Sequence, residues 1–210
     1  MLGLKFTPDL KWDAYIACVA KETARMVGLF YRSRKFLTPK AILYLYKSQI
    51  RPKMEYCCHI WASSSQHALS ALDRVQNRMR GLLGDGLFSS LQPLSHRRNV
   101  ASLALFYRYI NGKCSDELHS LVPKKPEFPR CTRFADSSKR HPHFLVIPKT
   151  RAMFHLNSFF PRTAAKWNSL PLECFPADFD LDLFKSRVNR YLSPSLVSLV
   201  FSFMYLLFIY

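Results

Sequence analysis

Apolar residues recur at spacings of three and four along most of the first half of the chain, the pattern of amphipathic helices. One stripe runs from Ile16 to Phe30, preceded by Asp13 as a candidate cap. Thr38-Pro39 predicts the start of a second helix, because a capping threonine precedes a proline at the first helical position. Further stripes cover residues 69–82 and 100–110. The pattern predicts a mainly α fold, a multi-helix bundle.

The second helix leads into the segment 45–61, LYKSQIRPKMEYCCHIW, which combines apolar, aromatic and charged residues with a proline. A residue before proline is biased away from the helical region, so we expect one helix to end near Arg51 and another to begin at Pro52. Glu55 lies within a turn of Arg51 and His59, which allows a local ion pair.

In that second short helix, Tyr56, Ile60 and Trp61 would fall on one side. Apolar stripes at helical spacing usually mean packing. The segment is therefore expected to be a kinked pair of helices with a buried Trp61.

The first residues and the region after residue 122 differ from this pattern. Residues 2–6 alternate with period two, which predicts a short strand; because no partner strand follows, we expect the chain to begin inside a larger domain. Prolines and basic residues predict an irregular basic linker at 123–157, with a brief strand at 144–147. Helices are then expected from about residue 158 and over 180–192, with Asp178, Asp180 and Asp182 capping the last one.

The tail 195–210 is uncharged and has 16 residues, fewer than the ~20 that span a bilayer as a helix. We favour a read-through peptide over a membrane anchor. The expected regions are a strand remnant at 1–12, a helical domain at 13–122, the linker at 123–157, a second small helical region at 158–192 and the tail at 193–210.

The net charge of +17 indicates a polyanionic partner, with nucleic acid favoured over an anionic membrane surface. The 14 acidic residues are scattered, whereas a polymerase or nuclease centre needs clustered carboxylates for two metal ions. No C-x-x-C pair and no glycine-rich phosphate loop is present, so no metal site is expected. Free thiols suit a reducing, intracellular compartment, the cytoplasm or nucleus.

Basic residues interleaved with aromatics are the best candidates for contacts to nucleic acid, because phosphate contacts and base stacking need that mixture. His96-Arg97-Arg98 place positive charge in the first turn of a helix, against the helix dipole. Either an anionic ligand compensates this charge or the side chains reach solvent. The candidate ligands are Arg97, Arg98, Arg130, Arg133, Arg140 and Arg162.

An ordered set of short motifs covers about residues 2 to 192. The pieces are Leu2-Gly3-Leu4 with Leu10 and Trp12; Lys47-Ser48-Gln49-Ile50-Arg51-Pro52 with Glu55-Tyr56 and Trp61; Leu72-Asp73-Arg74-Val75-Gln76-Asn77; Leu94-Ser95-His96-Arg97-Arg98; Phe159-Phe160-Pro161-Arg162 with Trp167-Asn168-Ser169-Leu170-Pro171; and Phe184-Lys185. In order and spacing this set resembles the region downstream of the polymerase palm in the endonuclease–reverse transcriptase proteins of non-LTR retrotransposons, the jockey-like group in particular. Arg51, Pro52, Glu55, Tyr56, Trp61, Trp167 and Asn168 form the signature that we expect to be structural.

The resemblance implies a parent protein that copies RNA into DNA at a nicked target site. It implies that this chain is the end of the palm, the thumb and a C-terminal helical region, and that it holds template–primer duplex of RNA and DNA. The family's catalytic acids, and the Mg²⁺ they bind, lie upstream of what corresponds to Leu2, so no catalytic residue and no cofactor is expected here. The alternative is a stand-alone helical interaction protein attached to a membrane through residues 195–210; the oligomeric state is left open.

Overall fold

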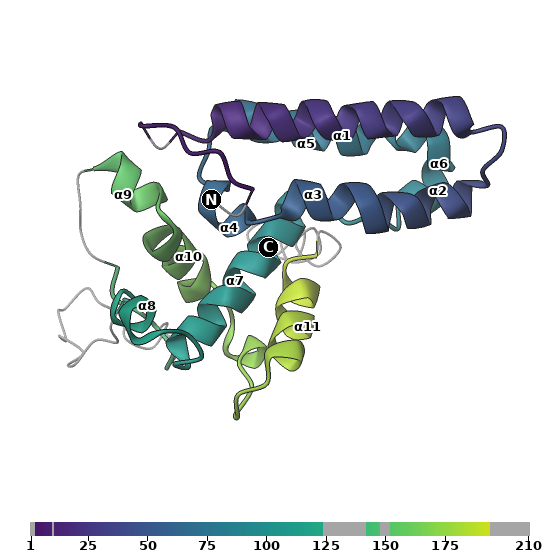
Figure 1. The fold of residues 1–210 in the computed structure, drawn as a ribbon. Helices are drawn as coiled ribbons and strands as arrows, with labels where there is room; N and C mark the ends of the chain where they lie inside the picture. Colours follow the sequence, from purple (N-terminus) through teal and green to yellow (C-terminus); the bar gives the residue numbers. More distant parts are fainter. Residues whose placement is uncertain (1–2, 10, 124–141, 148–151, 194–210) are drawn as a thin grey trace, which may run out of the picture. The chain divides into compact units, whose positions relative to one another are not determined.

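All the regular elements in the described part of the chain are helical, which confirms the expected mainly α fold (Figure 1). The computed structural model describes residues 3–9, 11–123, 142–147 and 152–193. The α-helices are α1 (Asp13–Ser33), α2 (Pro39–Leu45), α3 (Arg51–Glu55), α4 (Cys58–Trp61), α5 (Gln66–Arg78), α6 (Arg80–Phe88), α7 (Leu94–Ile110), α8 (Asp116–Ser120), α9 (Met153–Asn157), α10 (Phe159–Asn168) and α11 (Leu181–Tyr191). A π-helical segment, η1, covers Tyr46–Ile50, and a 3₁₀ turn, η3, covers Leu172–Cys174.

The chain divides into two compact units, unit 1 at Met1–Arg98 and unit 2 at Asn99–Tyr210. The sequence predicts one helical domain over 13–122, whereas this division falls inside α7. The reason lies in the two ends of that helix. Leu94 belongs to the core of unit 1, and Leu103 and Phe106 belong to the core of unit 2.

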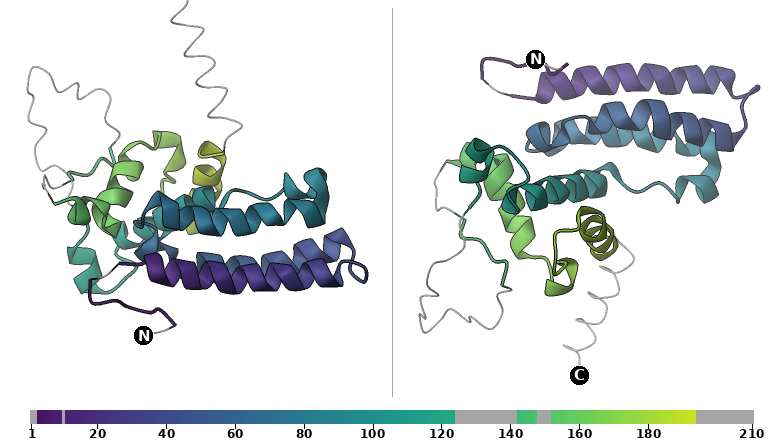
Figure 2. Two further views of the ribbon diagram at one scale, coloured as in Figure 1. Left: turned by 90° about the horizontal axis from the view of Figure 1, so that it is seen from above. Right: turned by 60° about the horizontal axis from the view of Figure 1, so that its bottom comes forward.

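In unit 1, α1 and α5 lie side by side and run in the same direction (Figures 1 and 2). Between them along the chain, α2, η1 and α3 form one nearly continuous helical segment that runs in the opposite direction. Contacts tie both ends of the α1–α5 pair: the Ser65 hydroxyl lies 3.3 Å from Asp13 Oδ1, and the Tyr31 hydroxyl donates to Arg78 O at 2.8 Å. Gly81 leaves room for that hydroxyl, since a Cβ there would lie 2.7 Å from it. The predicted stripe of α1 is confirmed by the burial of Ile16, Ala20, Thr23 and Val27.

The helix does not end at Arg51. Ile50 (φ −92°, ψ −52°) and Arg51 (φ −57°, ψ −44°) stay helical. Pro52 has no N–H to give to the preceding turn, and the Arg51 N–H bonds to Tyr46 O, five residues back, so the turn widens into the π-helical segment. The chain breaks later, at Tyr56 (ψ 126°) and Cys57 (φ 50°).

This later break corrects the predicted face of the second helix. Trp61 is buried, as expected, and its Nε1–H donates to Tyr56 O at 2.8 Å. Tyr56 is 46% exposed, because the break separates it from the helix that carries Trp61. Ile60 is on that helix but is 38% exposed, because neighbouring helical positions point in different directions.

The short strand expected at residues 2–6 is not formed in the described residues 3–9, which are turn and irregular chain. A lone strand has no ladder partner to satisfy its backbone groups. Leu4 packs instead into the core of unit 1.

The core of unit 2 is aromatic. Tyr107 of α7 stacks between Phe179 and Phe184, with ring centroids 5.2 Å and 4.2 Å away. Trp167 of α10 meets Phe106 edge-on at 5.4 Å and is 1% exposed. These rings fix α7, α10 and α11 around one centre.

The brief strand expected at 144–147 is likewise absent, and side chains take the place of a neighbouring strand. The Leu145 N–H donates to Asn168 Oδ1 at 3.0 Å, and Asn168 Nδ2 donates to Leu145 O at 2.9 Å. Trp167 Nε1–H donates to His143 O at 2.7 Å. The Trp167-Asn168 pair therefore holds the irregular segment at residues 143–145 against α10.

Candidate nucleic-acid interface

Arg97 and Arg98, two of the six predicted ligands, are engaged inside unit 1. Arg97 forms a two-bond ion pair with Glu55: its Nη2 lies 2.9 Å from Oε2, and its Nε bonds to Oε1. The hydrogen bonding of Arg97 to the Glu55 carboxylate raises the pKa of Arg97. Arg98 lies 3.6 Å from Asp73 Oδ1, and its side chain is 4% exposed.

Both arginines therefore act first as structural cations. Two carboxylates of the same unit, Glu55 and Asp73, compensate the positive charge in the first turn of α7. The sequence places Arg51 and His59 within reach of Glu55, but in the structure the carboxylate of Glu55 pairs with Arg97 of α7, a partner that the local spacing does not suggest. Arg98 is too buried to present its donors to a phosphate.

The remaining predicted ligands differ in what the structure shows of them. Arg162 is half-buried on α10, and its Nη1 is buried. Arg130, Arg133 and Arg140 lie outside the described residues, so their contacts to nucleic acid stay a prediction, as does the role of the tail 195–210.

Unit 1 carries far more positive than negative charge after its internal pairs are formed. Residues 1–98 contain 16 Lys and Arg and 6 Asp and Glu. Five of those acids are in ion pairs with a basic residue, and Asp13 accepts from Ser65. Within the described part of this unit, the basic residues left without a carboxylate partner are Lys5, Lys21, Arg25, Arg32, Arg34, Lys35, Lys40, Lys47, Arg51, Arg74 and Arg78.

Five of these unpaired cations gather at one end of unit 1. Figures 1 and 2 show that the loop from α1 to α2 lies at the same end as α6 and the end of α5. We call this end the basic end and define it by exposed residues of the last turns of α1 and α5, the loop and the first turn of α2: Arg32, Arg34, Lys35, Lys40 and Arg78.

Local structure explains why the basic end is well formed. The Thr38 hydroxyl caps α2 by accepting from the Ala41 N–H at 3.2 Å, as the sequence predicts. The Tyr31–Arg78 bond joins the ends of α1 and α5, and α2 packs against α6. Arg32 and Arg78 occupy last helical turns, where the helix dipole favours cations. Arg34 is the C-cap of α1 and shares this reason, whereas Lys35 lies beyond the end of the helix.

An aromatic side chain accompanies these charges. Phe36 is 87% exposed in the same loop. Its ring gives the basic end an exposed apolar surface next to Lys35. The run Arg32-Ser33-Arg34-Lys35-Phe36 is visible in the sequence as a basic turn, but only the fold brings Lys40 and Arg78 beside it.

Among the described residues, no three His, Cys, Asp or Glu side chains are placed to hold a metal ion. Over the same residues, no helix combines the length and apolar character that crossing a bilayer requires. No family model, no curated protein and no solved structure matches this chain.

Proposed function

We propose that this chain is the thumb and downstream helical region of a non-LTR retrotransposon reverse transcriptase, and that it binds the RNA–DNA template–primer duplex through the basic end of unit 1. The observation that carries the proposal is the excess of unpaired cations at that end beside Phe36. The motif resemblance supports the same function independently.

Electrostatics supports a polyanion at this surface. A duplex carries closely spaced phosphates, and each one that a Lys or Arg neutralises releases condensed counterions. The basic end offers five exposed cations on three helices and one loop, while the only acid of α6, Asp85, is paired with Arg80 at 3.6 Å. Phe36 adds an apolar surface for a sugar, a base edge or an unpaired template base.

The paired arginines have a different role in this proposal. Glu55–Arg97 and Asp73–Arg98 hold the first turn of α7 to α3 and α5. They keep the unit rigid, so that the cations of the basic end meet a duplex in a fixed geometry. We assign no catalytic residue and no metal to this chain. The described cysteines are all free thiols, which suits the cytoplasm or nucleus.

The test is the salt dependence of binding to a labelled RNA–DNA duplex with a recessed end, measured by fluorescence anisotropy. Five phosphate contacts predict a slope of log K against log salt of about −4 to −5. The double variant Arg34→Gln/Lys35→Gln should make that slope shallower by about 2, because each contact contributes about 0.9. Phe36→Ser should weaken binding and leave the slope unchanged.

The matched control is Lys5→Gln/Lys11→Gln, which removes the same charge at the start of unit 1, away from the basic end. It should change the slope by less than half as much. Equal effects of the two double variants would show non-specific attraction to net charge. A wild-type affinity that does not depend on salt, or binding to anionic vesicles without binding to the duplex, would overturn the proposal.

A further inference from the structure

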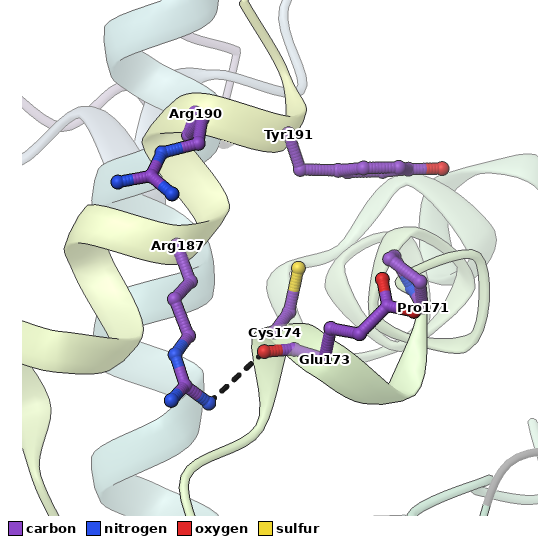
Figure 3. Close-up of a pocket in the computed structure, with 6 residues that line it drawn as sticks. All are labelled: Pro171, Glu173, Cys174, Arg187, Arg190 and Tyr191. Carbon is purple, nitrogen blue, oxygen red and sulfur yellow. Dashed lines mark hydrogen bonds between the residues drawn. The ribbon is translucent and has the colours of Figure 1, made fainter. Parts of the chain in front are cut away.

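Unit 2 contains a cavity of about 590 Å³ that the proposed function does not use. It lies between the end of α11 and the turn that contains η3, and its volume is in the range of small-molecule sites. Figure 3 shows the residues that line it, which are Pro171, Glu173, Cys174, Arg187, Arg190 and Tyr191.

The cavity carries two arginines that no carboxylate neutralises in the described residues. Arg187 Nη1 donates to Glu173 O at 3.0 Å and to Phe175 O at 3.2 Å. These neutral carbonyls orient the guanidinium and leave its charge in place. Arg190 is exposed on the last turn of α11 and forms no ion pair with a described residue, and Figure 3 shows its guanidinium directed away from the Tyr191 ring. Glu173 is the one acid in the lining, and Figure 3 shows its side chain directed toward Pro171 and away from Arg187. The lining therefore keeps a positive charge.

The rest of the lining is the aromatic ring of Tyr191 and apolar side chains. Figure 3 shows the Tyr191 ring lying over the turn that carries Pro171 and Cys174. The ring is held at its far end by a weak hydrogen bond of 3.4 Å from its hydroxyl to Ser169 O, and the residue is 40% exposed. The Cys174 thiol is buried, and burial raises its pKa to about 11, so it stays neutral and adds an apolar wall.

We propose that this cavity binds a nucleotide, with the base stacked on Tyr191 and the phosphate held by Arg187 and by Arg190, whose exposed side chain turns toward the cavity on binding. A positive edge beside an aromatic face is the arrangement that a phosphorylated base requires. The ligand is either a free nucleotide or one nucleotide of a single strand, since both present the same chemistry. The site uses no residue of the basic end, so nucleotide binding here can be tested independently of the proposed duplex binding.

The test is calorimetric titration of the full chain with adenosine 5′-monophosphate, adenosine and a six-nucleotide single strand. Tyr191→Leu should weaken the monophosphate and adenosine together by about tenfold, whereas Tyr191→Phe, which keeps the ring, should retain both. Arg190→Gln should weaken the monophosphate several-fold and leave adenosine unchanged. The matched control is Lys185→Gln on the same helix, outside the cavity lining, which should change neither affinity by more than twofold.

The single strand identifies the source of the ligand: tighter binding of the strand than of the monophosphate assigns the site to nucleic acid, and equal binding assigns it to a free nucleotide. Far-UV circular dichroism of each variant checks that α11 is intact. The inference is overturned if no nucleotide binds at millimolar concentration. It is equally overturned if folded Tyr191→Leu and Arg190→Gln proteins bind the monophosphate as the unaltered chain does.

Discussion

Replacing Glu55 by glutamine tests the structural role given to Arg97. The change keeps the size of the side chain and removes its charge. In the structure the carboxylate receives two hydrogen bonds from Arg97, and the two side chains are 21% and 31% exposed. The arginine would be left partly desolvated, with a neutral partner.

The expected loss lies between two limits. An exposed ion pair contributes about 0–1 kcal/mol, and breaking a fully buried one costs about 3–5 kcal/mol. Hydrogen bonds to charged groups contribute about 1.5–3 kcal/mol. For a two-bond pair at this intermediate exposure, we expect Glu55→Gln to lower the stability of unit 1 by about 2 kcal/mol.

The measurement is native-state hydrogen exchange along a urea series, read by mass spectrometry on peptides from residues 39–61, because this reports the opening of unit 1 by itself. The matched control is Glu22→Gln. Glu22 pairs with Lys53 at 2.7 Å, but these side chains are 57% and 47% exposed. Its loss should cost less than about 1 kcal/mol.

Two results would refute the reasoning. Equal, small losses for Glu55→Gln and Glu22→Gln would show that the pair with Arg97 contributes no more than a surface contact. A variant Arg97→Gln that keeps full stability and loses duplex affinity would show that Arg97 is a nucleic-acid ligand after all. A double-mutant cycle of the two positions isolates their coupling.

Two further outcomes follow from unit 2 and from the thiols. Asp180 accepts from the Leu183 N–H at 2.8 Å as the cap of α11, so Asp180→Ala should destabilise that helix by about 1 kcal/mol in hydrogen exchange of residues 181–191, and exposed Asp182→Ala should cost less. The thiolate is the reactive form of cysteine, and burial raises the pKa of Cys174 to about 11. At pH 8, iodoacetamide should therefore label exposed Cys18 and spare Cys174, whose labelling should rise only toward pH 11; fast labelling of Cys174 at pH 8 would contradict its burial.

Local signals in the sequence predicted the helices well, because their causes are local. The Thr38-Pro39 start is confirmed by the cap bond to Ala41. The stripe of α5 is buried at Leu69, Leu72 and Val75, since a period of three to four positions reflects one face turned to a core. Helix ends were less predictable, because they depend on competition between alternative backbone hydrogen bonds. A break was expected at Pro52, but the chain stays helical there by widening into a π-helical segment.

Partners far apart in the sequence could not be predicted from spacing. Glu55 and Arg97 are separated by 42 positions, and only the folding of unit 1 brings them together. The pair of bonds between Asn168 and Leu145 is another case, because a side-chain amide from 23 positions away binds the backbone where a brief strand was expected.

These pairings decide how the large net charge should be interpreted. A sequence shows how many cations a chain has, but not which of them are already used by its own carboxylates. In unit 1 the acids engage Arg97 and Arg98, the two arginines that look most like ligands in the sequence, and leave Arg34 and Lys35 exposed beside Phe36. Since desolvated, paired cations hold helices together and exposed, unpaired ones attract counterions, the salt slope of binding should depend on the second group and not on the first. Measuring that slope for Arg34→Gln/Lys35→Gln and for Arg97→Gln therefore separates the charges that build the fold from those that meet a partner.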